Sequence, residues 1–360
     1  MPTAFTARLS LRWCLLLIPL SVVLSVIATA VPNGALFAFL AAAGALMPLA
    51  ELIGVCTEQI AVHAGPRTGG LLTATFSNVP ELILAVFLLA GGQAVIVKAS
   101  LTGSIVANIL LVLGAAFLAG GRGQRVQRYS AAAAGVHATT LTLAVIGFLM
   151  PGVFVLTTGA HDAFQLEVVS TVVAVVLITL YLAALVFTQA NRDSLFRAPK
   201  MEDGAVWSLA LSVVLLVLAA GATALEAGLL VRALEPALAI IGLSKFFVGF
   251  ILVPIIGNVA EASSAVRFAL RNSLDVTFEI AIGSSTQVAL FVAPALVLIS
   301  LVLRHPMDLV FTAFQLTAVG LSTLILALVS HDGRSNWLEG AQLVAAYMIV
   351  ATSSFFVGSP

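Results

Sequence analysis

The sequence predicts an all-α polytopic membrane protein with about eleven transmembrane helices: one N-terminal helix followed by two inverted five-helix repeats. Three observations predict this fold: an apolar composition, the number of stretches that can cross a bilayer, and an internal repeat. Of the 360 residues, 61% are hydrophobic and 9% are charged, whereas soluble domains carry about 25% charged residues. Such a chain cannot cover itself with a polar surface, so the lipid bilayer is expected to surround it.

Eleven apolar stretches are long enough to cross the membrane, since a helix needs about 20 apolar residues to span the hydrocarbon. They lie near 13–31, 34–62, 69–91, 94–120, 129–151, 165–189, 205–232, 240–267, 274–303, 307–330 and 337–356. The longest polar connection, at about 189–204, marks the midpoint of the chain. Little chain remains for a soluble domain.

The first stretch also has features of a secretory signal. Arg8 and Arg12 precede it, and it ends in the A-x-A pattern of residues 28–30. Such a pattern is typical of a cleavage site. The apolar run from residue 13 to 30 is longer than the usual signal core, which favours a retained helix.

The positive charges predict the orientation. Twelve lysine and arginine residues fall on the side of the N-terminus and four on the opposite side. The positive-inside rule then places the N-terminus in the cytoplasm and the C-terminus outside. The expected location is the inner (plasma) membrane of a prokaryotic cell. Acidic and basic residues balance at 16 each, which argues against binding to nucleic acid.

One internal match is strong. Residues 77–81 (Ser-Asn-Val-Pro-Glu) match residues 257–261 (Gly-Asn-Val-Ala-Glu) at an offset of 180, and Gly103-Ser104 matches Gly283-Ser284 at the same offset. Five predicted spans separate the copies, an odd number, so the second copy enters the membrane from the opposite face. Inverted repeats are typical of secondary transporters, whose substrate sites lie near the bilayer midplane.

The repeat predicts four segments. Residues 1–33 form an additional N-terminal helix, 34–189 the first five-helix repeat, 190–204 a cytoplasmic linker, and 205–360 the second five-helix repeat.

Each repeat places one acid, Glu81 or Glu261, near the middle of a span. A carboxylate in hydrocarbon costs several kcal/mol, so it is normally paired, protonated or part of a transport path. Neutral oxygen ligands accompany both acids, several of them at the three- or four-residue spacing that shares a helix face. In the first repeat they are Ser77, Asn78, Ser104 and Asn108, and in the second Gly257, Asn258, Ser284 and Gln287.

This set of ligands suits a hard cation. Calcium prefers six to eight oxygen ligands from carboxylates, amides, carbonyls and water, and no cysteine or histidine lies near the motifs to favour a softer metal. Pro80 and Pro254 predict helix breaks near the acids, which would free carbonyl oxygens for an ion. Burial raises the pKa of a carboxyl group, so protons and one cation compete for the same acids. That competition is sufficient for an antiporter.

Three stretches, residues 69–83, 257–269 and 283–291, resemble the conserved repeats of the calcium/proton exchangers, a family of the calcium/cation antiporter superfamily. Thr57-Glu58 and the acids Glu226 and Glu235 also fit the family pattern. The resemblance implies export of cytosolic Ca²⁺ in exchange for H⁺ by alternating access. Carried over by position, Glu81 and Glu261 would be the shared Ca²⁺ and proton carboxylates, and the neutral residues named above would be ligands or orienting groups.

Some residues depart from the family pattern or lie outside the motifs. Thr73, Ser77, Ala107 and Ala262 replace common family residues, which bears on the neutral ligands and on ion selectivity. Glu58 and Glu226 lie in apolar surroundings and are further candidates for proton coupling. Glu279, one turn before Gly283, is a secondary candidate. The five histidines, His137 among them, are expected mostly in or near loops and solvated.

Several alternatives stay open at this point. A sodium-driven calcium exchanger or another cation/proton antiporter would use the same acids, and Pro80-Glu81 is typical of sodium-coupled relatives, whereas the paired N-x-x-E motifs favour protons. A cation channel is a further alternative. An enzyme is disfavoured because no nucleophile–base pair is visible. The expected partners are Ca²⁺, H⁺ and lipid, with no cofactor, and assembly into a homo-oligomer is left open.

Overall fold

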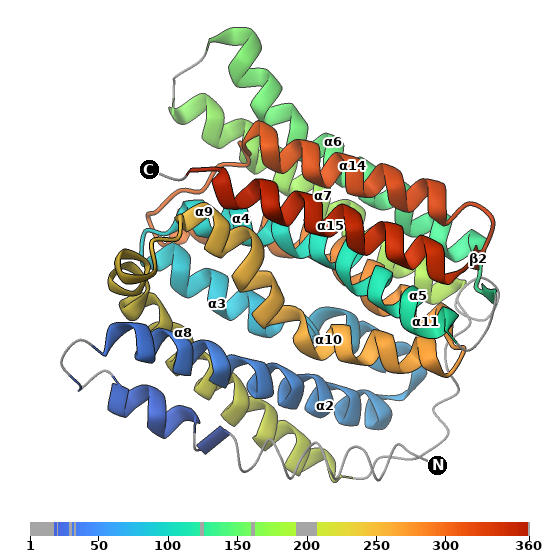
Figure 1. Ribbon diagram of the computed structural model, residues 1–360, viewed down its shortest axis with the longest axis horizontal. Helices are drawn as coiled ribbons and strands as arrows, with labels where there is room; N and C mark the ends of the chain where they lie inside the picture. The colour runs from blue at the N-terminus through green and yellow to red at the C-terminus, as the bar shows by residue number, and fades with distance from the viewer. Residues whose placement is uncertain are drawn as a thin grey trace. The chain divides into compact units, whose positions relative to one another are not determined.

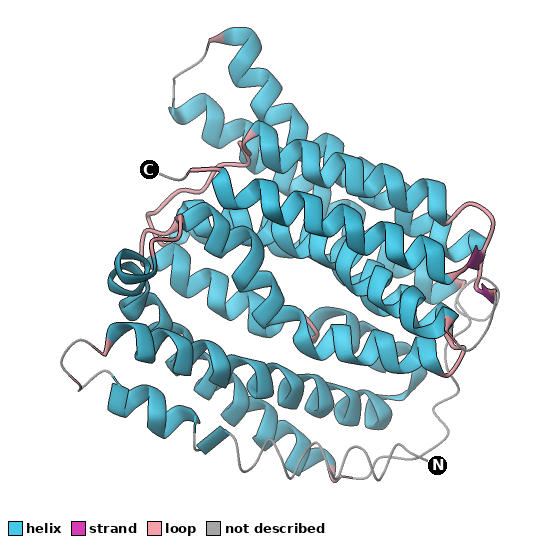
Figure 2. Ribbon diagram, viewed as in Figure 1, coloured by secondary structure: helices cyan, strands magenta, loops and turns pink. Residues whose placement is uncertain are grey.

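The computed structural model describes residues 18–19, 21–28, 31, 34–122, 126–159, 163–191 and 207–358, and nearly all of them are helical (Figures 1 and 2). The predicted all-α class is therefore confirmed. The end of the signal-like pattern and the linker from residue 192 onward lie outside the described residues. The chain divides into two compact units, residues 1–92 with 199–244 and residues 93–198 with 245–360.

The first unit contains helical residues 21–28 and three long elements. These are α2 (Ala35–Phe76), α3 (Val79–Ala90) and α8 (Leu209–Ile241). The side chains that hold α2 to α8 and its preceding turn form a buried apolar cluster of Leu49, Leu52, Ile53, Cys56, Trp207 and Ala219. This cluster contains one of the two cysteines as an ordinary core residue.

The α2 helix joins two of the predicted spans. Its 42 residues would measure about 63 Å if straight, roughly twice the hydrocarbon thickness. A side chain at Gly69 would overlap the backbone of Ala61, although eight residues of straight helix would separate these positions by about 12 Å. The backbone therefore turns sharply between Ala61 and Gly69, and the expected boundary between the second and third spans is a bend within helical structure.

The second unit holds the remaining elements (Figure 1). From the first repeat they are α4 (Ala94–Val106), η1 (Ala107–Val112), α5 (Leu113–Gly121), β1 (Gln127–Arg128), α6 (Ala131–Thr158) and α7 (Ala163–Ala190). From the second they are α9 (Lys245–Phe247), η2 (Val248–Leu252), α10 (Val253–Leu270), α11 (Leu274–Phe278), η3 (Glu279–Gly283), α12 (Ser284–Gln287), η4 (Val288–Val292), α13 (Ala293–Val302), α14 (Ala313–Val329), β2 (Arg334–Ser335) and α15 (Trp337–Phe356). The η segments are π-helical turns that continue the α-helices around them.

Among the described residues, seven helical runs are long and apolar enough to cross a membrane by themselves. They are Ala35–Ala64, Ala94–Gly121, Ala131–Thr158, Phe164–Ala190, Leu209–Ile241, Lys245–Leu270 and Leu274–Val302. Val79–Ala90 and Ala313–Val329 are apolar but shorter. For Val79–Ala90 the reason is local: the third predicted span is interrupted at Ser77-Asn78, where α2 ends and α3 begins.

The connections between the helices of the second unit lie at two opposite ends of that unit. At one end β1 pairs with β2 in antiparallel register, Gln127 opposite Ser335, and Gln127 Nε2 donates to the Ala269 carbonyl at 2.8 Å. Residues 126–130, 269–273 and 330–336 of three connections therefore lie together. The predicted topology places these same three connections on one side of the membrane, and which side is cytoplasmic stays a prediction.

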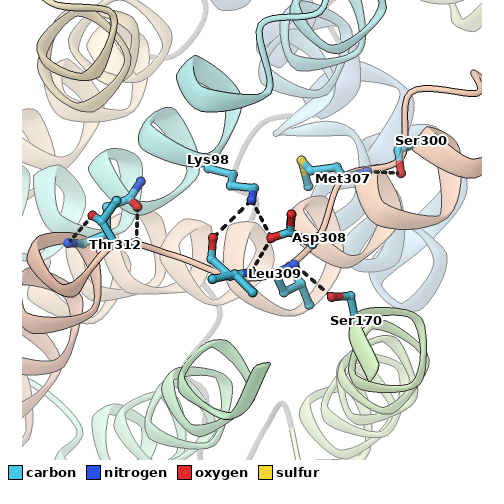
Figure 3. Close-up of polar contacts among 9 residues, drawn as sticks. Lys98, Ser170, Ser300, Met307, Asp308, Leu309 and Thr312 are labelled. Carbon is cyan, nitrogen blue, oxygen red and sulfur yellow. Dashed lines mark hydrogen bonds and ion pairs between the residues drawn. The ribbon is translucent and has the colours of Figure 1, made fainter. Parts of the chain in front are cut away.

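The opposite end is crossed by the connection between α13 and α14 (Figure 3). Its alternate residues Met307, Leu309 and Phe311 are buried, as in an extended segment with one face inward. Lys98 of α4 pairs with Asp308 and also donates to a carbonyl of this segment. Ser170 of α7 accepts a hydrogen bond from the Leu309 backbone at 3.1 Å. The segment thus ties α4 and α7 together.

Replacing Lys98 tests this tie. Lys98→Met leaves Asp308 and the Val310 carbonyl without their ammonium donor, and we expect the free energy of unfolding to fall by about 1–2 kcal/mol. Thermal unfolding of the purified protein in detergent measures the change. In Lys98→Met/Asp308→Asn the second substitution should cost much less than it does alone. Additive effects of the two substitutions would contradict a direct pair.

Candidate ion-binding site

The acid of the first repeat follows a helix break. Ser77 and Asn78 separate α2 from α3, and Glu81 lies in the first turn of α3. Pro80 fits there because the first turn of a helix needs no backbone donor from that residue. A carboxylate in the first turn is also favoured by the helix dipole. The end of α2 at Phe76 and the start of α3 at Val79 confirm the break expected near this acid. Asn78 is buried and Glu81 is partly exposed.

The acid of the second repeat lies on a continuous helix. Gly257, Asn258 and Glu261 all belong to α10, which runs unbroken from residue 253 to 270. The expectation of a break near Pro254 is therefore wrong. Pro254 follows the π-helical turn η2 instead. A π-turn holds an extra residue, which gives room for a proline ring that would clash with the carbonyl four residues earlier in an α-helix.

The helical segments that follow the Gly103-Ser104 and Gly283-Ser284 motifs contact each other within the second unit. Asn108 on η1 donates through Nδ2 to Ser284 Oγ on α12 at 3.3 Å. Asn108, Ser104 and Ser284 are buried, and Gln287 is partly exposed. The Asn108 Oδ1 atom is buried and has no hydrogen-bond partner among the described residues. A buried amide oxygen in that state costs about 1–3 kcal/mol, which a bound cation would offset.

The two repeats also share a π-helical turn at equivalent positions of the backbone. The π-turn η1 covers residues 107–112 and η4 covers 288–292, which are equivalent positions at the offset of 180 residues. Both turns follow the Gly-Ser motif closely. Such π-turns are frequent at functional sites, and their equivalence supports the alignment of the two motifs.

A close helix crossing depends on Gly103. A side chain at this position would overlap the carbonyl oxygen of Phe250 on η2, so only glycine allows α4 to approach the turn that leads into α10. The equivalent Gly283 has a different neighbour, since a Cβ there would lie 3.3 Å from Glu279 Oε1. The two glycines of the repeated motif therefore serve different contacts.

The predicted site residues are divided between the units. Glu261 shares the second unit with Gly257, Asn258, Ser284 and Gln287 of its own repeat. The same unit also holds Ser104 and Asn108, which the sequence analysis grouped with Glu81 of the first repeat. Glu81 shares the first with Ser77, Asn78, Glu58 and Glu226. That the two acids hold one ion stays a prediction.

Two further acids of the sequence prediction lie in different surroundings. Glu58 is exposed on α2. Glu226 is buried on α8, and its Oε1 accepts a hydrogen bond from Ser25 Oγ at 2.8 Å. Ser25 belongs to the N-terminal helix outside the repeat, so self-comparison of the sequence gives no signal for it.

The expectation that the histidines are solvated is wrong for His137. Its side chain is 12% exposed, and Nε2 lies 3.1 Å from Glu279 Oε2. The residue is the seventh of α6, inside the helix rather than in the preceding connection. The sequence missed the contact because His137 and Glu279 are in different repeats and neither has a counterpart in the internal match.

Comparison with known proteins places these observations in a family. The model of the sodium/calcium exchanger protein family matches residues 34–189 and 211–356. The chain belongs to this family. It is 41% identical over 337 residues to a Ca²⁺/H⁺ antiporter of Aphanothece halophytica, covering 88% of this chain and 90% of that protein. It is 38% identical over 346 residues to the Ca²⁺/H⁺ antiporter ChaA of Bacillus subtilis, covering 94% and 97%.

A solved structure agrees with the fold. The Ca²⁺/H⁺ antiporter protein YfkE superposes with a TM-score of 0.82 at 36% identity, covering 96% of this chain and all of that one. The family resemblance expected from the two motifs is confirmed.

The helix crossing at Gly103 gives a direct test of the site's framework. Gly103→Ala must push α4 away from Phe250, and overpacking of this kind costs about 1–3 kcal/mol. Gly135→Ala on α6, where a Cβ meets nothing within 4 Å, is the matched control and should be neutral or slightly stabilising. Thermal unfolding in detergent compares the two. Equal stability of both variants would refute the close crossing.

Proposed function

We propose that this chain is a secondary active antiporter that exports cytosolic Ca²⁺ in exchange for H⁺ by alternating access. The proposal is carried by one observation: the chain is about 40% identical, over nearly its whole length, to proteins named Ca²⁺/H⁺ antiporters. The inverted acid motifs support it independently, because they supply one carboxylate and a set of neutral oxygens from each repeat. We assign it no catalytic residue and no cofactor.

Glu81 and Glu261 are the proposed shared carboxylates for Ca²⁺ and H⁺. The neutral ligands or orienting groups are the buried amides Asn78, Asn258 and Asn108, together with Ser77, Ser104, Gly257, Ser284 and Gln287. Support comes from the Asn108–Ser284 bond, which joins the two repeats. The unpartnered Asn108 Oδ1 supports it further.

Charge explains how these groups couple the two ions. Two ionised carboxylates carry two negative charges, which is costly in a low-dielectric interior. Either one Ca²⁺ or two protons neutralises the pair, whereas an empty ionised pair does not form readily. The site therefore changes its access from one side of the membrane to the other when it holds either Ca²⁺ or protons. The two kinds of ion compete for the same carboxylate oxygens. Glu58 and Glu226 are further proposed proton-coupling groups.

The proposed topology places residues 1–33 outside the repeats and the linker 190–204 in the cytoplasm. The N-terminus is then cytoplasmic, the C-terminus outside, and the location a prokaryotic inner (plasma) membrane. The grouping of three arginine-bearing connections at one end of the second unit supports this orientation. The bacterial relatives support the proposed location. The proposed partners are Ca²⁺, H⁺ and lipid.

Flux in liposomes tests the exchange. Purified protein in sodium-free proteoliposomes with an acidic interior should take up Ca²⁺, and an ionophore that collapses the pH gradient should stop the uptake. The counter-ion must be a proton because no other cation gradient is present. Uptake that ignores the pH gradient but requires a sodium gradient would establish the sodium-coupled alternative. Conductive Ca²⁺ flux without any counter-ion would establish a channel.

Neutralising either acid tests the shared carboxylates. We expect Glu81→Gln and Glu261→Gln each to abolish exchange, because a single remaining carboxylate cannot hold Ca²⁺ at a neutral site. The same liposome assay measures the loss. Glu167→Gln, which neutralises an exposed acid on α7, is the control and should exchange normally. Normal pH-driven uptake by either motif variant would refute the shared site.

A further inference from the structure

Glu279 stands apart from the other acids at its end of the second unit. Asp275 accepts a hydrogen bond from the Ser130 backbone, Asp332 from that of Arg334, and Glu339 from that of Asn336. These three acids are explained as turn or helix-cap residues. Glu279 instead contacts a side chain, His137, and its own side chain is 55% exposed.

The position of Glu279 relates it to the ion-binding motif. It opens η3, which leads directly into Ser284. Glu279, Gly283 and Gln287 follow one another at four-residue spacing and so lie on about the same helix face. Since a Cβ on Gly283 would lie 3.3 Å from Glu279 Oε1, the carboxylate occupies the space that a side chain at 283 would fill. The carboxylate therefore leans along the helix toward Gly283, the residue before Ser284.

His137 fixes the other side of this carboxylate. It lies on α6, a helix of the first repeat, and its ring contacts Oε2 while Oε1 is the atom that lies over Gly283. The contact thus fixes the direction in which Glu279 points. It also leaves more than half of the glutamate side chain exposed.

The repeat makes this acid specific to one membrane side. At the offset of 180 residues Glu279 corresponds to Ala99, which is buried on α4. Because the repeats are inverted, Ala99 lies toward the opposite end of the unit, near Lys98 and Asp308. The end that carries Glu279 also carries several arginines, on its three connections and in the last turn of α10: Arg122, Arg128, Arg267, Arg271 and Arg334.

We propose that Glu279, positioned by His137, is the first contact of the divalent cation on the cytoplasmic side, before it reaches Ser284, Gln287 and Glu261. This rests on the proposed function and orientation. Arginines repel a divalent cation, whereas a carboxylate ahead of the motif raises its local concentration. The acid is outside the central site, so it sets the apparent affinity from one side and not the maximal rate.

Transport kinetics in membrane vesicles of opposite sidedness test the proposal. In everted vesicles, Glu279→Gln should raise the KM for Ca²⁺ about three- to tenfold with little change in maximal rate, within the range of electrostatic steering. In right-side-out vesicles, where Ca²⁺ meets the other face, the KM should stay at the wild-type value. A purely structural role would lower the maximal rate or the protein level in both orientations.

Variants of the partner and a matched acid complete the test. His137→Ala should raise the same KM to a smaller extent, and His137→Gln, which keeps a side-chain donor, should restore it. Glu167→Gln neutralises an exposed acid on the proposed outer side and should leave the cytoplasmic KM unchanged. An unchanged KM in both Glu279→Gln and His137→Ala would overturn the inference, as would complete loss of transport in Glu279→Gln at a normal protein level. Wild-type protein without pH-driven Ca²⁺ uptake would instead overturn the proposed function.

Discussion

The constraint on which this structure depends is that a bilayer offers no partner to a polar group. Every buried donor and acceptor must be satisfied by the protein or by its cargo. Most buried hydroxyls of the described residues meet this constraint locally, as Thr223 does by bonding to a carbonyl of its own helix. The amide of Asn108 does not. Asn108 bonds across to Ser284 with one atom and leaves its oxygen buried without a partner. A transported cation is the simplest group that satisfies such an oxygen and that leaves again.

The two repeats meet this constraint with different backbones. In the first, Pro80 follows an interruption at Ser77-Asn78, and the acid lies at a helix start. In the second, Pro254 follows a π-turn and the helix continues through Asn258 and Glu261. The motif thus lies at the start of a helix in the first repeat and inside a continuous helix in the second repeat. The two acids consequently differ in the local helix dipole that each of them meets.

The sequence predicts the fold class and the family well, because these depend on properties that a single chain displays. The apolar composition indicates that lipid surrounds the chain. The match between residues 77–81 and residues 257–261 indicates the internal repeat. The bend between Ala61 and Gly69 and the π-turn before Pro254 were not predictable, since both depend on which helix packs nearby. Ser25 and His137 were missed for a related reason: their partners, Glu226 and Glu279, lie about 200 and 142 residues away, and no repeat connects them.

The long-range contacts also show that the repeat is a unit of sequence and not of folding. In the second unit, the bonds that fix its two ends join residues of different repeats: β1 with β2, Lys98 with Asp308, and Ser170 with the Leu309 backbone. The Asn108–Ser284 bond and the Gly103 crossing in its interior do the same. In the first unit, α2 packs against α8, which is its counterpart in the second repeat. Either repeat alone would leave the interior side chains of Asn108 and Ser284 without each other, and an unsatisfied polar group in hydrocarbon costs several kcal/mol. The interlocking therefore makes the two repeats fold together, and it brings Asn108 of the first repeat into contact with Ser284 of the second.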